Sequence, residues 1–176
     1  MPFEVVVADG LSADKTLEHA VRWARFEPVR VIQMTHEKDR NCGAGVELGF
    51  LGARGDRLLF MDGDMVLRRG FLRHAMQYLD QHPRCAGVAG LLVEASMRNA
   101  TDRIRVRQGL NRTVGAQHWL NGGGLYRRVA LLSAGGYAGV RRLAAFVEAD
   151  LGLRLERAGW VLHRLEVPAM LHKGHT

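Results

Sequence analysis

The chain has 176 residues, is 47% hydrophobic and carries a formal net charge of +7, so it is long enough for a single domain over residues 1–176 with a sizeable core. Two cysteines are too few for a disulfide framework, and no apolar run approaches the roughly 18 residues of a membrane span. With no leader sequence after Met1, we expect a cytoplasmic protein whose many arginines suit phosphate-bearing ligands, nucleic acid or an acidic membrane surface.

The first half of the chain alternates β-rich runs with helical segments. Strands are expected at residues 3–8, 29–32, 58–61 and 85–92. Helices are expected at residues 12–24, 43–53 and 70–80. Alternation at this spacing predicts an α/β fold with a mostly parallel central sheet and helices on both faces, of the Rossmann-like kind.

Residues 94–113 have a different composition, with five arginines and one acid between them, and we expect a loop that runs over the sheet. These residues are Arg98, Arg103, Arg105, Arg107, Arg112 and the acid Asp102. The rest of the chain predicts a strand at 117–120, a glycine turn at 122–124, helices at 128–133 and 146–157, and β segments at 160–165 and 169–172.

The apolar run 58–61 ends in two carboxylates one residue apart, Asp62 and Asp64. Two neighbouring carboxylates repel each other unless a cation or hydrogen-bond donors lie between them. The carboxyl ends of strands are also where α/β sheets bind ligands. The pattern therefore favours a divalent-cation site, although Asp-Gly-Asp is also typical of an ordinary turn.

Four sequence blocks, taken in order, resemble the family 2 glycosyltransferases of the GT-A fold. They are residues 5–16 with Asp9-Gly10, 53–72 with Asp62-Gly63-Asp64, 121–137 with Gly122-Gly123-Gly124, and 147–160 with Glu148-Ala149-Asp150. The resemblance implies that a metal-dependent enzyme transfers a sugar from a nucleoside diphosphate sugar to the hydroxyl of a saccharide or lipid-linked acceptor. It also implies inversion at the anomeric carbon.

The resemblance assigns the metal site to three residues. Asp64 would ligate Mg²⁺ or Mn²⁺ between the two phosphates, since hard carboxylate oxygens suit these ions. Asp62 would take part in the same site by orienting the ribose or a metal-bound water. His172 matches a position that contacts the metal or a phosphate, and its alternative role is that of an ordinary surface histidine.

Catalysis and nucleotide contact are assigned to five further residues. Glu148 stands where the family usually has the aspartate that acts as general base, and Asp150 is the fallback base. Both acids are also typical of a helix start. Asp9, Arg127 and Arg128 would contact the nucleotide, and solvated arginines at a helix start are the alternative for the last two.

Members of the family begin with a strand and a turn that cradle the nucleobase, and the sequence before Val5 is too short for both. We therefore expect an N-terminally truncated domain in which the strand at Val5 lacks one neighbour. In addition, Ala8 replaces a usual aspartate. An uncovered strand edge and apolar surface would favour a homo-oligomer.

Three other functions remain open. The missing first strand and Ala8 favour a degenerate GT-A domain that acts as a non-catalytic binding or partner module. Residues 62–67 also match haloacid-dehalogenase-like phosphatases, but Lys173 is the only lysine downstream. Nucleic-acid binding through the arginine-rich stretch lacks interleaved aromatic residues, so no nucleic-acid partner is expected, whereas peripheral membrane contact is compatible with the charge.

Overall fold

The strands form two separate sheets in the described part of a computed structural model, which comprises residues 2–95, 103–104, 107, 112–137, 143 and 145–173. The strands are β1 (Val5–Asp9), β2 (Val29–Gln33), β3 (Arg57–Leu59), β4 (Met65–Leu67), β5 (Cys85–Glu94), β6 (Gly115–Gln117), β7 (Leu125–Arg127) and β8 (Val161–His172). The helices are α1 (Thr16–Trp23), the 3₁₀ helix η1 (Glu37–Asp39), α2 (Cys42–Gly52), α3 (Phe71–Gln81), α5 (Arg128–Ser133) and α6 (Val147–Arg157). Arg98, Asp102 and Arg105 of the expected arginine-rich loop lie outside the described residues.

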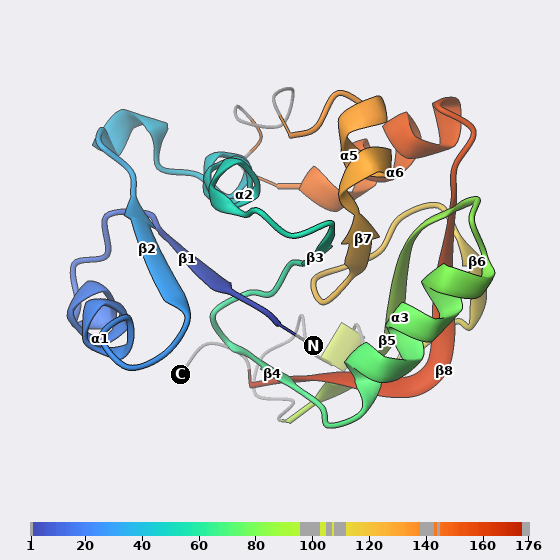
Figure 1. Ribbon diagram of the computed structural model, residues 1–176, viewed down its shortest axis with the longest axis horizontal. Coiled ribbons are helices and arrows are strands. Elements are labelled where there is room, and N and C mark those ends of the chain that lie inside the picture. Colours follow the sequence, from blue (N-terminus) through green and yellow to red (C-terminus); the bar gives the residue numbers. More distant parts are fainter. Residues whose placement is uncertain are drawn as a thin grey trace.

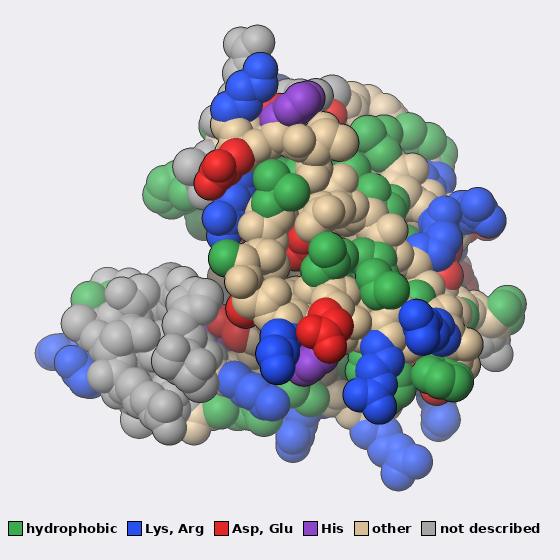
Figure 2. Space-filling view, turned by 90° about the vertical axis from the view of Figure 1, so that its left-hand side faces the viewer, with side chains coloured by type: hydrophobic (Ala, Val, Ile, Leu, Met, Phe, Trp, Pro, Cys, Tyr) green, Lys and Arg blue, Asp and Glu red, His purple; other side chains and the backbone are tan. Residues whose placement is uncertain are grey.

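The N-terminal unit is a parallel pair, β1 and β2, with α1 beside it (Figure 1). Within the described residues β1 pairs with β2 alone, as expected for a strand that lacks a second neighbour. Hydrophobic side chains remain uncovered here, since Val5, Trp23 and Phe26 are 43%, 61% and 77% exposed. Figure 2 shows this side of the molecule, where hydrophobic side chains lie among basic and acidic ones.

The larger sheet has the strand order β3-β7-β5-β8-β4, with β6 also paired to β8. Successive residues of its strands point to opposite faces, so Leu125 and Tyr126 of β7 belong to two different core clusters. On one face α3 buries Phe71, Ala75 and Leu79 at helical spacing. On the other face α6 buries residues 147, 151 and 155 at the same spacing.

Helix α2 connects the two units (Figure 1). Its first turn is capped by Asn41, whose side-chain oxygen accepts a hydrogen bond from the Ala44 N–H at 2.9 Å. Gly49 faces Ala8 of β1, while Phe50 packs in the core of the larger sheet against Tyr137, with ring centroids 5.5 Å apart. Because both faces of α2 are packed, its N-terminus is held at a fixed place beside the larger sheet.

The predicted α/β class is confirmed, but the expectation of a mostly parallel sheet is wrong. Four of the six strand pairs in the described part of the chain are antiparallel. All four involve β4, β6 or β7, each only three residues long, which is too short for a recognisable alternation. The strand predicted at 117–120 lies at Gly115–Gln117, and the two segments predicted at 160–165 and 169–172 are one strand, β8.

Candidate active site

The turn between β3 and β4 carries the two predicted carboxylates, Asp62 and Asp64. Before the turn, the Phe60 carbonyl accepts a hydrogen bond from the Gly123 N–H at 2.8 Å. The turn closes where the Met65 N–H donates to the Asp62 carbonyl at 3.1 Å. Asp62 is exposed and Asp64 is half-buried, so the end of β3 presents two carboxylates on a short, hydrogen-bonded turn.

His172, at the end of β8, meets the second carboxylate of this turn. Its Nε2 atom lies 3.1 Å from Oδ2 of Asp64, and the Asp64 carbonyl accepts a hydrogen bond from the Lys173 N–H at 2.9 Å. The antiparallel pairing of β4 with β8, which sets Met65 opposite His172, brings the two together. His172 is 9% exposed, so it is not an ordinary surface histidine.

Glu94 completes this group, and the sequence predictions did not include it. Its Oε2 atom lies 2.6 Å from Nδ1 of His172, on the side of the ring away from Asp64. Burial opposes charge on the imidazole, but hydrogen bonding to Glu94 and the charges of Glu94 and Asp64 hold the pKa of His172 above its ordinary value. Glu94 is the last residue of β5, and it lacks the second nearby carboxylate that drew attention to Asp62 and Asp64 in the sequence.

Glu148, the predicted base, lies in the first turn of α6 and is half-buried. Burial, together with the negative charge of Asp62, raises the pKa of Glu148 above the ordinary glutamate value. Burial and the charges of Glu148 and Asp62 likewise raise the pKa of the Cys42 thiol at the start of α2. These shifts place Asp62, Glu148 and Cys42 within one electrostatic neighbourhood.

Gly122 allows the loop before β7 to approach the carboxylate turn closely. A Cβ atom at this position would lie 2.7 Å from the Met65 methyl and 2.8 Å from Oδ2 of Asp62. Gly63, between the two carboxylates, has open space where its Cβ would be. The position of Asp62 therefore requires glycine at residue 122, whereas a side chain at residue 63 would not disturb it.

Asp150, the fallback base, is paired with Arg154 in the same helix. Its Oδ2 atom accepts a hydrogen bond from Nε of Arg154 at 2.8 Å. Arg154 in turn donates from Nη1 to the carbonyls of Ala134 and Gly136, both at 2.6 Å. Asp150 therefore orients an arginine that ties α6 to the chain after α5.

Asp9 lies at the end of β1 and is 3% exposed. Its carboxylate accepts hydrogen bonds from the Ser12 N–H and, at 2.9 Å, from Nε2 of Gln33. Hydrogen bonding from Ser12, ahead of that from Gln33, holds the pKa of Asp9 below its ordinary value despite burial. In this structure Asp9 shapes the turn after β1.

Arg127 and Arg128, which were predicted to contact the nucleotide, donate from their guanidinium groups to main-chain carbonyls, and their contact with a nucleotide stays a prediction. Arg127 is paired with Arg57 at the start of β3, five residues before Asp62, and it donates to the carbonyls of Cys85, Leu79 and His82. Arg128 donates to the Gly55 and Ala53 carbonyls at 2.8 and 2.7 Å. Both guanidinium groups thus satisfy main-chain oxygens at the other end of β3.

The side chains at the turn fit a small, hard divalent ion. In the described part of the chain there is no group of three or more His, Cys, Asp or Glu side chains placed to hold a metal. Oδ2 of Asp64 and Nε2 of His172, 3.1 Å apart, offer one oxygen and one nitrogen donor on the side of the ring that faces the turn. Mg²⁺ commonly takes one or two protein donors and completes its coordination with substrate phosphates and waters, so two donors are sufficient.

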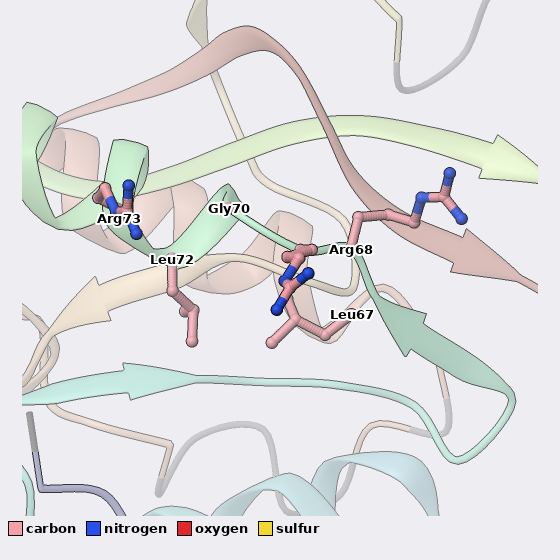
Figure 3. A pocket seen from close by; sticks show the side chains of 6 residues that line it. Leu67, Arg68, Gly70, Leu72 and Arg73 are labelled. Carbon is pink, nitrogen blue, oxygen red and sulfur yellow. The ribbon is translucent and has the colours of Figure 1, made fainter.

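A basic hollow of about 240 Å³ lies directly after β4, lined by Leu67, Arg68, Arg69, Gly70, Leu72 and Arg73 (Figure 3). The three arginines are exposed and the two leucines half-buried. No helix in the described residues has the length and apolar character needed to cross a bilayer. The hollow combines positive charge with apolar side chains at the surface, a few residues from Asp64.

Solved structures similar to this chain include S. aureus TarS 1-349 in complex with UDP-GlcNAc, with a TM-score of 0.79, 17% identity, and coverage of 100% of this chain and 52% of that one. The TarS 1-349 complex with UDP has a TM-score of 0.77 and 18% identity, covering 99% and 53%. A mannosyltransferase, PcManGT from Pyrobaculum calidifontis in complex with GDP-Man and Mn²⁺, has a TM-score of 0.66 and 20% identity, covering 97% and 47%. The chain thus spans about half the length of these structures.

Comparison with curated proteins finds no match. The family model described as Glycosyl transferase family 2 matches residues 1–141. That match covers well over half of the sequence, and the fold agrees with the GT-A structures above. The chain therefore belongs to glycosyl transferase family 2 and has the GT-A fold.

Proposed function

We propose that this chain is a glycosyltransferase domain that moves a sugar from a nucleoside diphosphate sugar to an acceptor hydroxyl. The observation that carries the proposal is the contact between Asp64 and His172. Asp64 lies on the same turn as Asp62, whose negative charge raises the pKa of Glu148. The similar structures contain UDP-GlcNAc, UDP, or GDP-Man with Mn²⁺, which supports a nucleotide-sugar donor and a divalent metal.

In this proposal Asp64 and His172 would hold Mg²⁺ or Mn²⁺, and Asp62 would orient the ribose or a water beside it. The bound metal would supply positive charge next to the diphosphate. The half-buried position of Asp64 and the low exposure of His172 support this assignment, since a partly desolvated site strengthens electrostatic interactions.

Glu148 is the proposed general base. The acceptor oxygen attacks the anomeric carbon and its proton passes to the Glu148 carboxylate. At the same time the bond from the anomeric carbon to the diphosphate oxygen breaks, and the diphosphate leaves with the electron pair. A pKa above the ordinary glutamate value makes Glu148 a stronger base, which suits this role. Attack opposite the leaving group would invert the configuration.

A pair of matched variants tests the base. Glu148→Gln should reduce transfer or donor hydrolysis by about 10²- to 10⁴-fold while donor binding is kept, because a positioned base typically contributes that much. Asp150→Asn should keep most of the activity, because Asp150 is bound to Arg154. Activity lost in Asp150→Asn and kept in Glu148→Gln would move the base to Asp150.

A second candidate function is a non-catalytic binding or partner module. Two observations favour this candidate. The Asp9 carboxylate accepts hydrogen bonds from Ser12 and Gln33, and β1 pairs with β2 alone in the described residues. Folded protein that binds no nucleotide, with or without Mn²⁺, would support this candidate. Membership of family 2 removes the phosphatase alternative.

The acceptor, a membrane contact and self-association are further proposals. A saccharide or lipid-linked acceptor fits the proposed chemistry, and the basic hollow after β4 is the surface we propose for contact with an acidic membrane.

Exposed Trp23 and Phe26 beside β1 support a homo-oligomer. Elution volume measured against protein concentration tests the last proposal, and a monomer at all concentrations would contradict it.

A further inference from the structure

We propose that Glu94 is a positioning residue, whose carboxylate fixes the ring of His172 so that Nε2 faces Asp64. The inference rests on the proposed metal site, and it assigns a role to a carboxylate that the metal assignment leaves unused. The relevant contacts are 2.6 Å from Glu94 to Nδ1 and 3.1 Å from Asp64 to Nε2.

The main chain already holds the segment that carries His172. Glu94 and His172 are partners in the parallel pairing of β5 with β8. The Ala95 N–H donates to the His172 carbonyl at 2.8 Å, and the next residue, Lys173, is bonded to the turn of Asp64. What remains to be fixed is the rotation of the imidazole ring and the choice of the nitrogen that carries hydrogen.

The Glu94 carboxylate can fix both. At 2.6 Å the contact is short and charge-assisted, and the two side chains are only 8% and 11% exposed, so little water competes. A carboxylate accepts and does not donate, so Nδ1 carries a hydrogen toward Glu94 and, without a metal, Nε2 carries one toward Asp64. A ring that ligates a metal through Nε2 keeps only the hydrogen at Nδ1, which Glu94 holds. The Nε2 atom is then directed at Asp64 before any metal binds.

The geometry also separates positioning from direct ligation. Glu94 contacts the nitrogen on the far side of the ring, so it does not share with Asp64 the nitrogen that faces the proposed ion. Carboxylates that hold the second nitrogen of a ligating histidine commonly affect metal affinity by about 10- to 100-fold when they are removed.

The experiment measures Mn²⁺ alone, by electron paramagnetic resonance, on the whole chain. Glu94→Ala should weaken Mn²⁺ binding by about 10- to 100-fold. Glu94→Gln should stay within roughly threefold of the unaltered chain, because an amide oxygen can still accept the Nδ1 hydrogen. The control is Glu166→Ala, on the same strand as His172 but exposed, which should bind Mn²⁺ unchanged.

A second readout needs no metal. Side-chain ¹⁵N spectra, assigned with His172→Gln, should show Nδ1 of His172 protonated in the unaltered chain and in Glu94→Gln, and altered in Glu94→Ala. Unchanged His172 nitrogen shifts together with unchanged Mn²⁺ affinity in Glu94→Ala would overturn the proposal. So would an equal loss of Mn²⁺ in Glu94→Gln and Glu94→Ala with unchanged shifts, because it would make Glu94 a direct ligand.

Two further outcomes are also decisive. If Glu94→Ala does not fold, Glu94→Asp, which withdraws the carboxylate by one methylene, should weaken Mn²⁺ binding several-fold, and full affinity would overturn the proposal. If the unaltered chain binds no Mn²⁺, the proposed metal site fails. The ¹⁵N comparison then still decides whether Glu94 positions His172.

Discussion

Oδ2 of Asp64 lies 3.1 Å from Nε2 of His172, although 108 residues separate them in the sequence. The short antiparallel pairing of β4 with β8 produces this contact, because Met65 and His172 are opposite one another. A carboxylate and an imidazole are thereby held together at the end of β3, where the second carboxylate, Asp62, also lies. The proposed activity depends on this arrangement.

Gly122→Ala should weaken metal-dependent nucleotide binding. The new methyl group would lie 2.8 Å from Oδ2 of Asp62 and 2.7 Å from the Met65 methyl, so the Asp62 carboxylate and the end of the Met65 side chain must move from their present positions. Overpacking of this kind costs about 1–3 kcal/mol, and we expect a loss of roughly tenfold in nucleotide affinity, measured by calorimetry with Mn²⁺.

Gly63→Ala is the matched control, because a Cβ at Gly63 meets nothing within 4 Å. It changes the same turn by the same methyl group, and nucleotide affinity should stay within about twofold. Equal losses in the two variants would show that the turn tolerates no substitution, and would remove the specific role of Gly122.

Glu148 should make the stability of the fold depend on pH. Its folded pKa is raised, chiefly by burial, so the folded state binds the Glu148 proton more tightly than the unfolded state, whose value is near the ordinary 4.5. Stability should therefore fall as the pH rises from 4.5 through the folded pKa. Relative to Glu148→Gln, the melting temperature of the unaltered chain should decrease over that window, and a parallel course of the two proteins would contradict the shift.

Cys42 should report occupation of the site. Cys42 is exposed at the start of α2, while Cys85 is buried, so N-ethylmaleimide should label the native protein at Cys42 alone. Labelling should be slow at neutral pH, since the loss of part of the water around the Cys42 sulfur and the charges of Glu148 and Asp62 raise the pKa of the thiol. Mass spectrometry should show that UDP or GDP with Mn²⁺ slows the labelling further, by several-fold.

Cys42→Ser provides the control for this experiment. It should remove the labelling and leave nucleotide binding unchanged, because no role in binding is assigned to the thiol. If calorimetry shows that the nucleotide binds but Cys42 is labelled equally fast with and without it, the nucleotide must lie away from Asp62 and Glu148.

The basic hollow should bind vesicles that contain phosphatidylserine. Replacing Arg68, Arg69 and Arg73 with glutamate should reduce co-sedimentation by at least tenfold at low salt, since each basic side chain near such a surface contributes about 1 kcal/mol. A control with Arg22→Glu and Arg25→Glu on and beside α1 should bind more strongly than the triple variant. Equal losses would indicate net charge, without a specific surface.

Part of the site could be predicted from the sequence. The apolar run that precedes Asp62 indicated the carboxylate turn, and the resemblance to family 2 glycosyltransferases indicated Glu148 at the start of a helix. The sequence could not indicate that Glu94 lies against His172, since that contact depends on the register of β5 with β8, 78 residues apart. Long-range register is set by packing, and local pattern does not carry it.

The two arginines show a further limit of sequence patterns. Arg127 and Arg128 follow a glycine-rich turn, a setting typical of phosphate contact, yet each guanidinium is used by main-chain carbonyls. The direction of the short strand β7 decides this outcome, and a strand of three residues leaves no sequence pattern from which the direction can be predicted. Composition and spacing alone do not distinguish an arginine that binds a ligand from one that supports a turn.

The most direct test of the proposed metal–diphosphate site is a calorimetric titration of UDP and GDP into the chain with and without Mn²⁺, repeated with Asp64→Ala. The site predicts that at least one nucleotide binds with Mn²⁺, and that removing Mn²⁺ or the Asp64 carboxylate each weakens binding by tenfold or more. Nucleotide binding that is equal with and without Mn²⁺, and unchanged in Asp64→Ala, would contradict it.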